Sequence, residues 1–151
     1  MSDLMKNIKN LSKITGAGFL DCKKALEENK NDIDNSIDFL RKKGLAKANK
    51  KSSREANEGA VGIFSNSNFT NILQINTETD FAAKNEVFLS FMEEIGNFSL
   101  NIKDSNLTLE DFNNMIFDNI SISDRFKNII SKIGENIILT KLLITKKTKA
   151  I

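Results

Sequence analysis

Few side chains in this sequence could carry out covalent chemistry. The 151 residues include no His, which excludes an imidazole base, a Ser-His-Asp type of triad and a His-ligated metal. The single cysteine, Cys22, lies between Phe19 and Leu26 on an apolar stripe, so we expect a buried thiol and not an activated nucleophile. One cysteine also cannot form an internal disulfide or a paired-cysteine metal site. The residue types therefore argue against an enzyme and against a bound metal or cofactor.

Two further patterns have a binding or catalytic interpretation that the sequence does not favour. Gly16 and Gly18 precede an expected helix, where free backbone N–H groups can hold a phosphate. They lack the Lys-Ser/Thr ending of a phosphate-binding loop, so a plain turn between helices is the better interpretation. Acidic pairs at residues 93–94 and 110–111 have no partner groups converging on them and are expected on solvated helix faces.

Phe81 is the residue with two opposing interpretations. It stands beside Asp80, after an expected strand and before an expected helix. Phe88 follows seven residues later, a helical spacing that favours Phe81 as the first buried turn of that helix. An aromatic ring beside a carboxylate on a loop is also a suitable protruding anchor for a partner. The residues alone leave both interpretations open.

The composition is that of an ordinary globular protein, with 40% hydrophobic and 28% charged residues. No apolar run approaches the roughly 18 residues of a membrane span, and the N-terminal segment lacks the apolar stretch of a signal peptide. Together with the single cysteine, these features predict a soluble protein of the reducing cytoplasm that does not contact a membrane.

The charge is unevenly divided along the chain. Residues 1–54 hold 13 Lys and Arg against 7 Asp and Glu, and residues 55–151 hold 9 against 13. This asymmetry indicates two units with different partners. The densest basic stretch, residues 41–54, gives an alternative function as a basic helical module that binds nucleic acid. No aromatic residue interleaves with it, so a solvated linker helix is preferred and no direct nucleic-acid contact is expected.

Apolar spacing in the first 44 residues predicts three short helices in a compact bundle. Residues 15–18 and 29–32 interrupt the pattern as turns, and Gly44 is expected to end the third helix. The following residues, 45–54, are basic and free of Gly and Pro, which predicts a separate helical linker. The expected apolar faces are Leu4, Ile8, Leu11 and Ile14; Phe19, Cys22, Ala25 and Leu26; and Ile33, Ile37 and Leu40.

Beyond residue 55 the apolar period changes from about 3.6 to 2, which predicts strands. The first strand, around residues 60–64, has small residues on one face, and a second strand around 73–75 pairs back as a hairpin. Residues 137–145 are rich in β-branched side chains and predict a third strand. The expected fold class is therefore α+β, with a small three-stranded antiparallel sheet packed against helices.

Three amphipathic helices are expected between the second and third strands. Thr108 and Ser121 are start signals for two of them, because each is followed by an Asp three residues later. Gly134 is expected to end the last helix. The expected buried residues are Phe88, Phe91, Met92, Ile95 and Phe98; Phe112, Met115 and Ile116; and Phe126, Ile129, Ile130 and Ile133.

Three segments occur in the order and at the intervals of a known family. They are Thr15-Gly16-Ala17-Gly18 followed by Asp21-Cys22-Lys23-Lys24-Ala25-Leu26, then Thr79-Asp80-Phe81 with Ala83 and Asn85, then Ile133-Gly134-Glu135-Asn136-Ile137. With these segments the chain resembles bacterial elongation factor Ts, the guanine-nucleotide exchange factor for elongation factor Tu. The resemblance covers essentially the whole chain, and three matches in register are highly specific.

The resemblance implies a fold and a domain division. Residues 1–54 would form a three-helix bundle like the ubiquitin-associated domain, together with its linker helix. Residues 55–151 would form the first core subdomain. Typical members continue into a second core half and a C-terminal helical module, so we expect either a missing half or a homodimer paired through strand 137–145. Ubiquitin binding by the first domain remains a further alternative, based on fold analogy alone.

The resemblance also implies a function without covalent chemistry. Members bind elongation factor Tu loaded with GDP and promote GDP release, and they bind the nucleotide-free form more tightly. Asp80 and Phe81 would enter between partner helices beside the nucleotide and its Mg²⁺ site. The implied wedge segment is Thr79, Asp80, Phe81, Ala82, Ala83, Lys84 and Asn85, with Ala82 where the family commonly has Val.

Two other groups of residues receive a role from the resemblance. The implied N-terminal docking face consists of Gly16, Ala17, Gly18, Phe19 and Asp21. Residues Gly134, Glu135 and Asn136 would either support the core or contact the partner. The sequence leaves these two roles open.

Overall fold

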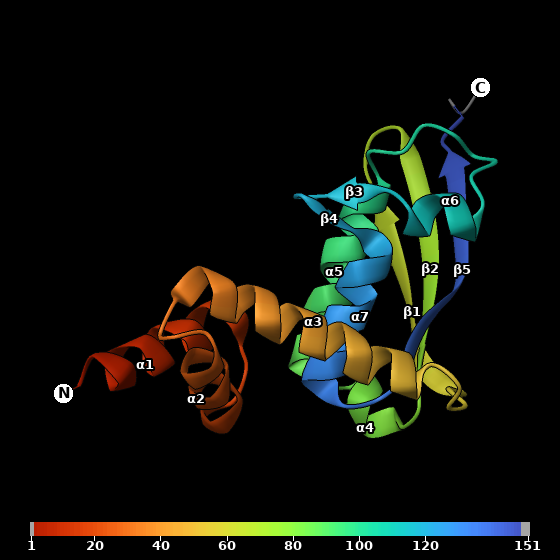
Figure 1. Ribbon diagram of the computed structural model, residues 1–151. Helices are drawn as coiled ribbons and strands as arrows, with labels where there is room; N and C mark the ends of the chain where they lie inside the picture. The colour runs from red at the N-terminus through yellow and green to blue at the C-terminus, as the bar shows by residue number, and fades with distance from the viewer. Residues whose placement is uncertain (1, 149–151) are drawn as a thin grey trace. The chain divides into compact units, whose positions relative to one another are not determined.

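The computed structural model describes residues 2–148, and the chain divides into two compact units between Lys50 and Lys51. The first unit is helical, and the second combines helices with a three-stranded antiparallel sheet (Figure 1). The expected α+β class is confirmed. The sequence places the domain boundary after Arg54, four residues later than this division. Among the described residues, no helix has both the length and the apolar character needed to cross a bilayer.

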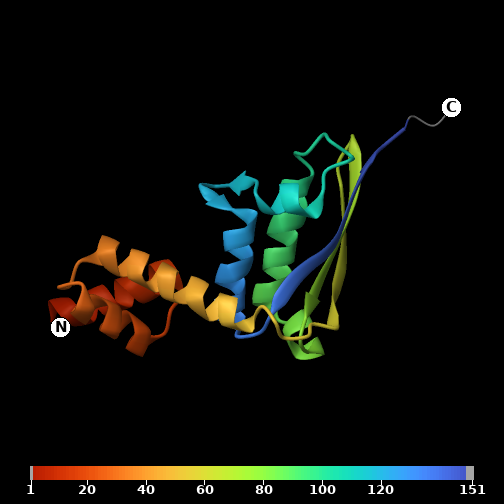
Figure 2. The same ribbon diagram turned by 45° about the vertical axis from the view of Figure 1, so that its right-hand side comes forward.

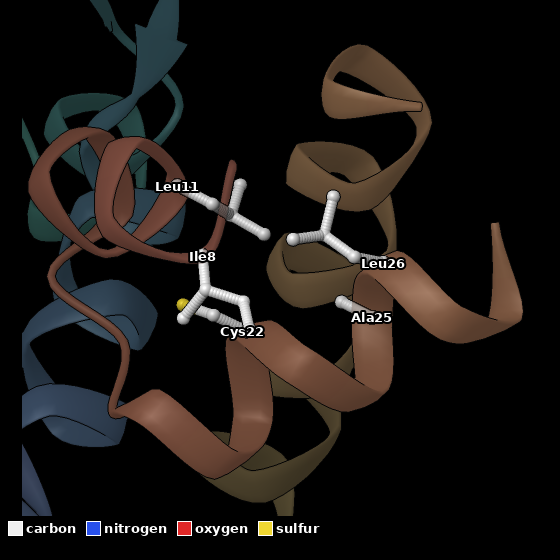
Figure 3. Packing of buried hydrophobic residues seen from close by; sticks show 5 residues of the cluster. All are labelled: Ile8, Leu11, Cys22, Ala25 and Leu26. Carbon is white, nitrogen blue, oxygen red and sulfur yellow. The ribbon is translucent and has the colours of Figure 1, made fainter. Parts of the chain in front are cut away.

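The first unit contains α1 (Asp3–Thr15), α2 (Phe19–Glu28) and the first part of α3 (Ile33–Lys51). Ser2 caps α1 by accepting a hydrogen bond from the Met5 N–H, and Gly16 ends it with φ 73°. Side chains from α1 and α2 converge in a core whose members are at most 2% exposed (Figure 3). They are Ile8, Leu11, Cys22, Ala25 and Leu26.

Two expectations for this unit are wrong. Ile14 and Phe19 continue the apolar spacing but are exposed, because each lies at the end of its helix next to the interhelical loop. Gly44 does not end the third helix, which continues through the expected linker to Lys51 as one element. A glycine inside a helix costs only about 1 kcal/mol relative to Ala, so it cannot end a helix whose next residues are good helix formers.

The sheet of the second unit has the order β1-β2-β5 and is antiparallel throughout. It consists of β1 (Glu58–Ser65), β2 (Phe69–Thr77) and β5 (Ile137–Lys146). Helices α5 (Glu86–Ser99) and α7 (Ile122–Ile133) lie side by side on one face of it (Figure 2). Every second residue of the central strand β2 is buried, the pattern of a strand with one face against the core.

The small residues of β1 make room for an aromatic ring. The ring of Phe64 lies against Gly96 of α5, where an added Cβ would stand 2.2 Å from a ring carbon. Gly62 is similarly close to the same ring. The face of β1 that carries Val61 and Ile63 is exposed instead. The sequence predicted this strand and a face with small residues. The packing of Phe64 explains why that face is directed toward the helices.

The connection from α5 to α7 differs from the expected helix. α6 (Leu109–Asn113) is short, and a two-stranded hairpin of β3 (Ile116–Phe117) and β4 (Ile120–Ser121) follows it. Ile116 is therefore exposed on a strand and Met115 is only partly buried, against expectation. The turn residues Asp118 and Asn119 both have positive φ, the geometry of a tight hairpin.

The helix starts at Thr108 and Ser121 are confirmed, because each side chain accepts a hydrogen bond from the backbone N–H three residues later. The helical stripes in α5 and α7 are also largely buried as expected, with Phe98 and Ile133 only partly so. At the C-terminal strand, Ile144 is buried. Its neighbour Leu143 is exposed.

Candidate functional site

The segment around Phe81 forms a one-turn helix, α4 (Asp80–Ala83), directly after β2. It lies at one end of the sheet, and α6 and the β3–β4 hairpin lie at the other end (Figure 1). Thr79 caps α4, because its Oγ1 accepts a hydrogen bond from the Ala82 N–H at 3.2 Å. Ala82 and Ala83 are buried, whereas Asp80 and Phe81 face solvent. The cap and the two small buried residues thus orient the turn with Phe81 outward.

Phe81 is 83% exposed, and Phe88 one turn into α5 is fully buried. The interpretation of Phe81 as the first core residue of the following helix is therefore wrong. The helix that carries Phe88 begins only after Asn85, whose Oδ1 accepts a hydrogen bond from the Val87 N–H. The break between the two helices rotates Phe81 away from the buried stripe. Phe81 has the highest exposure among the large hydrophobic residues that the structure describes.

The remaining polar residues of the segment are also exposed. Asp80 Oδ2 lies 3.7 Å from Lys84 Nζ, and more than half of each side chain is accessible to solvent. Such exposed pairs contribute little to stability, so Asp80 is free to exchange this partner for another. The segment therefore presents one carboxylate and one aromatic ring next to each other on a capped turn.

Glu135, in the turn between α7 and β5, holds the backbone that enters α4. Its Oε1 accepts hydrogen bonds from the N–H groups of Glu78 and Thr79, at 3.1 and 3.0 Å. Its Oε2 accepts a hydrogen bond of 2.7 Å from the Thr79 hydroxyl. One carboxylate thus binds three donors immediately before Phe81.

The neighbours of Glu135 anchor the same turn. Gly134 ends α7 with φ 88°, a left-handed conformation that favours glycine, and its carbonyl accepts a hydrogen bond from Lys51 Nζ. Asn136 is buried, and its side-chain amide donates to the Arg54 carbonyl at 2.7 Å. The third sequence segment thus makes structural contacts within the core unit.

The expected N-terminal docking face surrounds the turn between α1 and α2. Gly16 has φ 73° and is required by the turn, but Gly18 has φ −69°, and a Cβ added to it would meet no atom within 4 Å. Leu20, absent from the expected face, is 77% exposed. In the sequence, the exposure of Leu20 is indicated only by its position outside the buried apolar face of α2. Nothing in the described part of the unit explains either the glycine at 18 or the exposed leucine.

Asp21 and Cys22 have internal roles in this unit. Asp21 Oδ1 accepts a hydrogen bond from Lys43 Nζ at 3.1 Å, and Lys47 lies 3.7 Å from the other oxygen. The hydrogen bond from Lys43 lowers the pKa of the Asp21 carboxyl, with Lys47 adding to the effect and partial burial opposing it. Burial raises the pKa of the Cys22 thiol, which keeps it protonated and unreactive. The expected burial of Cys22 is confirmed.

Comparison with known proteins identifies the family. Residues 78–151, which include α4 and the turn of Glu135, match the family model described as Elongation factor TS. The chain is also 44% identical over 139 residues to the Elongation factor Ts of Campylobacter hominis. Residues 78–151 therefore form an elongation factor Ts domain. The resemblance to elongation factor Ts that the three sequence segments indicated is thereby confirmed.

The elongation factor Ts relative is considerably longer than this chain. The alignment covers 90% of the chain and 39% of the relative. Because it leaves out only about a tenth of the chain, it extends well beyond the residues of the family model into the N-terminal unit. Among the described residues, no group of His, Cys, Asp and Glu could hold a metal ion.

Proposed function

We propose that this chain binds the GDP-bound form of elongation factor Tu in the cytoplasm and promotes the release of GDP. The observation that carries the proposal is Phe81, an almost fully exposed aromatic ring on a capped turn within an elongation factor Ts domain. A large apolar side chain held in water gains free energy when a partner buries it. Phe81 therefore acts as the wedge between partner helices, and Asp80 approaches the phosphate and Mg²⁺ region of the partner.

The proposed reaction is a shift in a binding equilibrium. A factor that binds nucleotide-free elongation factor Tu more tightly than the GDP form must, by linkage, weaken the binding of GDP by the same ratio. Insertion of Phe81 supplies such a difference if the ring is buried fully only when the nucleotide is absent. No general acid, base or nucleophile takes part, so the proposed function is nucleotide exchange without covalent chemistry.

The N-terminal unit supplies the second contact in this proposal. Gly18 and the first two residues of α2, Phe19 and Leu20, are exposed, and the two apolar side chains suit a docking surface. Asp21 belongs to the expected face as well, but its carboxylate is engaged by Lys43 and Lys47. We therefore assign the docking contact to Gly18, Phe19 and Leu20 and a supporting role to Asp21.

Stopped-flow release of labelled GDP from elongation factor Tu tests the proposal. The parent chain is expected to accelerate release, and Phe81→Ala to reduce the effect about thirtyfold, the cost of losing an anchor worth about 2 kcal/mol. Asp80→Ala is expected to give a milder defect. Ile116→Ala, an exposed apolar side chain on the distant hairpin, serves as the control and should release GDP like the parent. A folded Phe81→Ala chain with the parent rate would refute the wedge.

The alternative of a nucleic-acid-binding helix gains no support from residues 41–54. Most basic side chains of this stretch have a partner within the chain: Arg41 and Lys42 pair with Asp38, Lys43 and Lys47 with Asp21, Lys51 with the Gly134 carbonyl, and Arg54 with Glu78. Such pairs compete with phosphate for the same cations. A steep salt dependence of RNA or DNA binding would revive this alternative.

A further inference from the structure

We propose that Glu135 is the positioning residue of the exchange wedge: its carboxylate fixes the backbone at residues 78–79 so that α4 keeps Phe81 projected into solvent. The proposal rests on the proposed exchange function. It assigns to the turn at residues 134–136 a role in presenting the wedge, in place of a direct contact with the partner.

The wedge needs such support because α4 has only four residues. A helix of one turn does not persist in water by its own hydrogen bonds, since nucleation costs more than one turn returns. The exposed ring of Phe81 adds no packing that could hold the turn in place. The conformation of α4 must therefore be fixed by groups outside it.

The carboxylate of Glu135 supplies this support at the entrance of α4. It accepts hydrogen bonds from two successive backbone N–H groups, those of Glu78 and Thr79, which precede the helix and have no helical partner. It also accepts the hydroxyl proton of Thr79. Thr79 Oγ1 can then direct a lone pair to the Ala82 N–H, so the cap of α4 and the bond to Glu135 use the same oxygen atom.

The contact is reciprocal, which makes it rigid. Glu78 Oε1 accepts a hydrogen bond of 2.7 Å from the Asn136 N–H, so each of the two segments binds the backbone of the other through a carboxylate. Arg54 Nη1 lies 3.5 Å from the same Glu78 oxygen and balances one of the two negative charges. The buried amide of Asn136 fixes the far side of the turn. Charge-assisted hydrogen bonds of this kind are stronger than neutral ones.

The consequence for exchange is preorganisation. With Glu135 in place, Phe81 meets the partner in one conformation, and little ordering remains to be done on binding. Without it, the N–H groups of Glu78 and Thr79 turn to water and α4 frays. Phe81 keeps its side chain in that case but loses its fixed direction.

Hydrogen exchange on the full chain tests the geometry without reference to activity. In Glu135→Ala, the amides of Glu78, Thr79 and Ala82 are expected to lose protection, while those of β2 keep theirs. Glu93→Ala, which removes an exposed carboxylate on α5, is the matched control and should leave all of them unchanged. Unchanged protection of these three amides in a folded Glu135→Ala chain would overturn the proposal.

A double-mutant cycle then tests whether Glu135 acts through Phe81. Glu135→Ala is expected to weaken the acceleration of GDP release about tenfold, because the mobile α4 must then be ordered when it binds. In the Phe81→Ala background the same change should cost nothing further, because the side chain it positions is gone. Two independent, multiplying losses would show a direct partner contact and overturn the positioning role.

The outcomes separate this inference from the proposed function. If Phe81→Ala exchanges GDP like the parent, the wedge fails, and hydrogen exchange alone decides whether Glu135 fixes the segment. If Phe81→Ala is defective and Glu135→Ala is not, the wedge stands and the positioning role fails. Should Glu135→Ala not fold, Glu135→Gln replaces it. Gln keeps an oxygen that accepts from the two N–H groups, whereas Thr79→Val removes the cap of α4. The Ala82 amide should therefore be better protected in Glu135→Gln than in Thr79→Val.

Discussion

Phe81 and Phe88 are the same side chain in opposite environments, one 83% exposed and the other 0%. Truncation should therefore separate their roles. We expect Phe88→Ala to lower the free energy of unfolding by about 3–5 kcal/mol, because it removes a fully buried ring and leaves a cavity. Phe81→Ala should change it by less than about 0.5 kcal/mol, as for other exposed sites.

Urea unfolding of both variants, followed by circular dichroism, measures the difference. A loss of more than about 2 kcal/mol in Phe81→Ala would mean that the ring has a packing role. The exchange defect of that variant would then reflect instability and not a lost contact.

Gly16 and Gly18, in the turn between α1 and α2, differ in backbone conformation, so their substitutions should have different effects. Gly18→Ala should change the free energy of unfolding by less than about 0.5 kcal/mol, since φ is −69° and the added methyl meets open space. Gly16→Ala should cost about 1–2 kcal/mol, because φ is 73°. If the loop docks on elongation factor Tu, Gly18→Ala should nevertheless weaken binding, because the methyl group prevents close approach.

Thermal or urea unfolding and a titration against elongation factor Tu together check the glycine prediction. Gly16→Ala is the control, because it adds the same methyl group at a positive φ and shows how far a loss of stability alone lowers the apparent affinity. Parent-like binding by Gly18→Ala would remove this position from the docking face.

Asp21 of α2 pairs with Lys43 and Lys47 of α3 through one carboxylate. The hydrogen bond from Lys43 lowers the pKa of Asp21, so the charged form is favoured in the folded state. Its stabilisation is therefore present above about pH 4, the ordinary range of an Asp carboxyl, and is lost as the pH falls through the lowered folded-state pKa. Because the side chain is 39% exposed, the contribution at neutral pH should be below about 1 kcal/mol.

Asp21→Asn provides the comparison. Its unfolding free energy should lie below that of the parent at neutral pH, and the two should converge in acid and at high salt. A difference that persists below about pH 2 would have a cause other than the charge of Asp21.

Capping hydrogen bonds determine where several of the described helices begin. Thr108 and Ser121 begin their helices as expected, because a cap is a local hydrogen bond. Gly44 does not end α3, which continues to Lys51. A glycine alone supplies no capping side chain and costs a helix only about 1 kcal/mol. The β3–β4 hairpin lies outside the reach of apolar spacing, since strands of two residues carry no period.

At the scale of the whole chain, the division between Lys50 and Lys51 predicts separate folding of the N-terminal unit. A fragment of residues 1–54 keeps α1, α2 and all of α3, and it should show helical circular dichroism with a broad transition of low stability. A core of this size buries few side chains, so the free energy of unfolding should be small. A fully unstructured fragment would contradict the division.

The C-terminal strand predicts self-association. Within the described residues, β5 pairs with β2 along one edge and with no strand along the other, which is a template for a second copy. Leu143 of this edge strand is exposed. Sedimentation should show a concentration-dependent dimer, which Leu143→Lys should suppress by placing a charge on the edge strand. A folded chain that stays monomeric at high micromolar concentration would exclude pairing through this strand.

Features that depend on local spacing could be predicted from the sequence. Apolar periods of about 3.6 and 2 predicted the helices, the hairpin and the α+β class, because side-chain direction follows directly from backbone geometry. Helix starts followed from single capping residues. The three signature segments were sufficient to predict the family, although they did not reveal how the segments contact one another.

Burial and the contacts between distant segments depend on tertiary packing, which local spacing does not reveal. Phe81 fits a helical period with Phe88, and its exposure follows from the break at Asn85 and from the surrounding packing. The hydrogen bonds that Glu135 accepts from Glu78 and Thr79 join residues more than 50 positions apart. No local sequence pattern relates residues at such a separation. Contacts of this kind depend on the pairing of β5 with β2, which brings the two ends of those strands together.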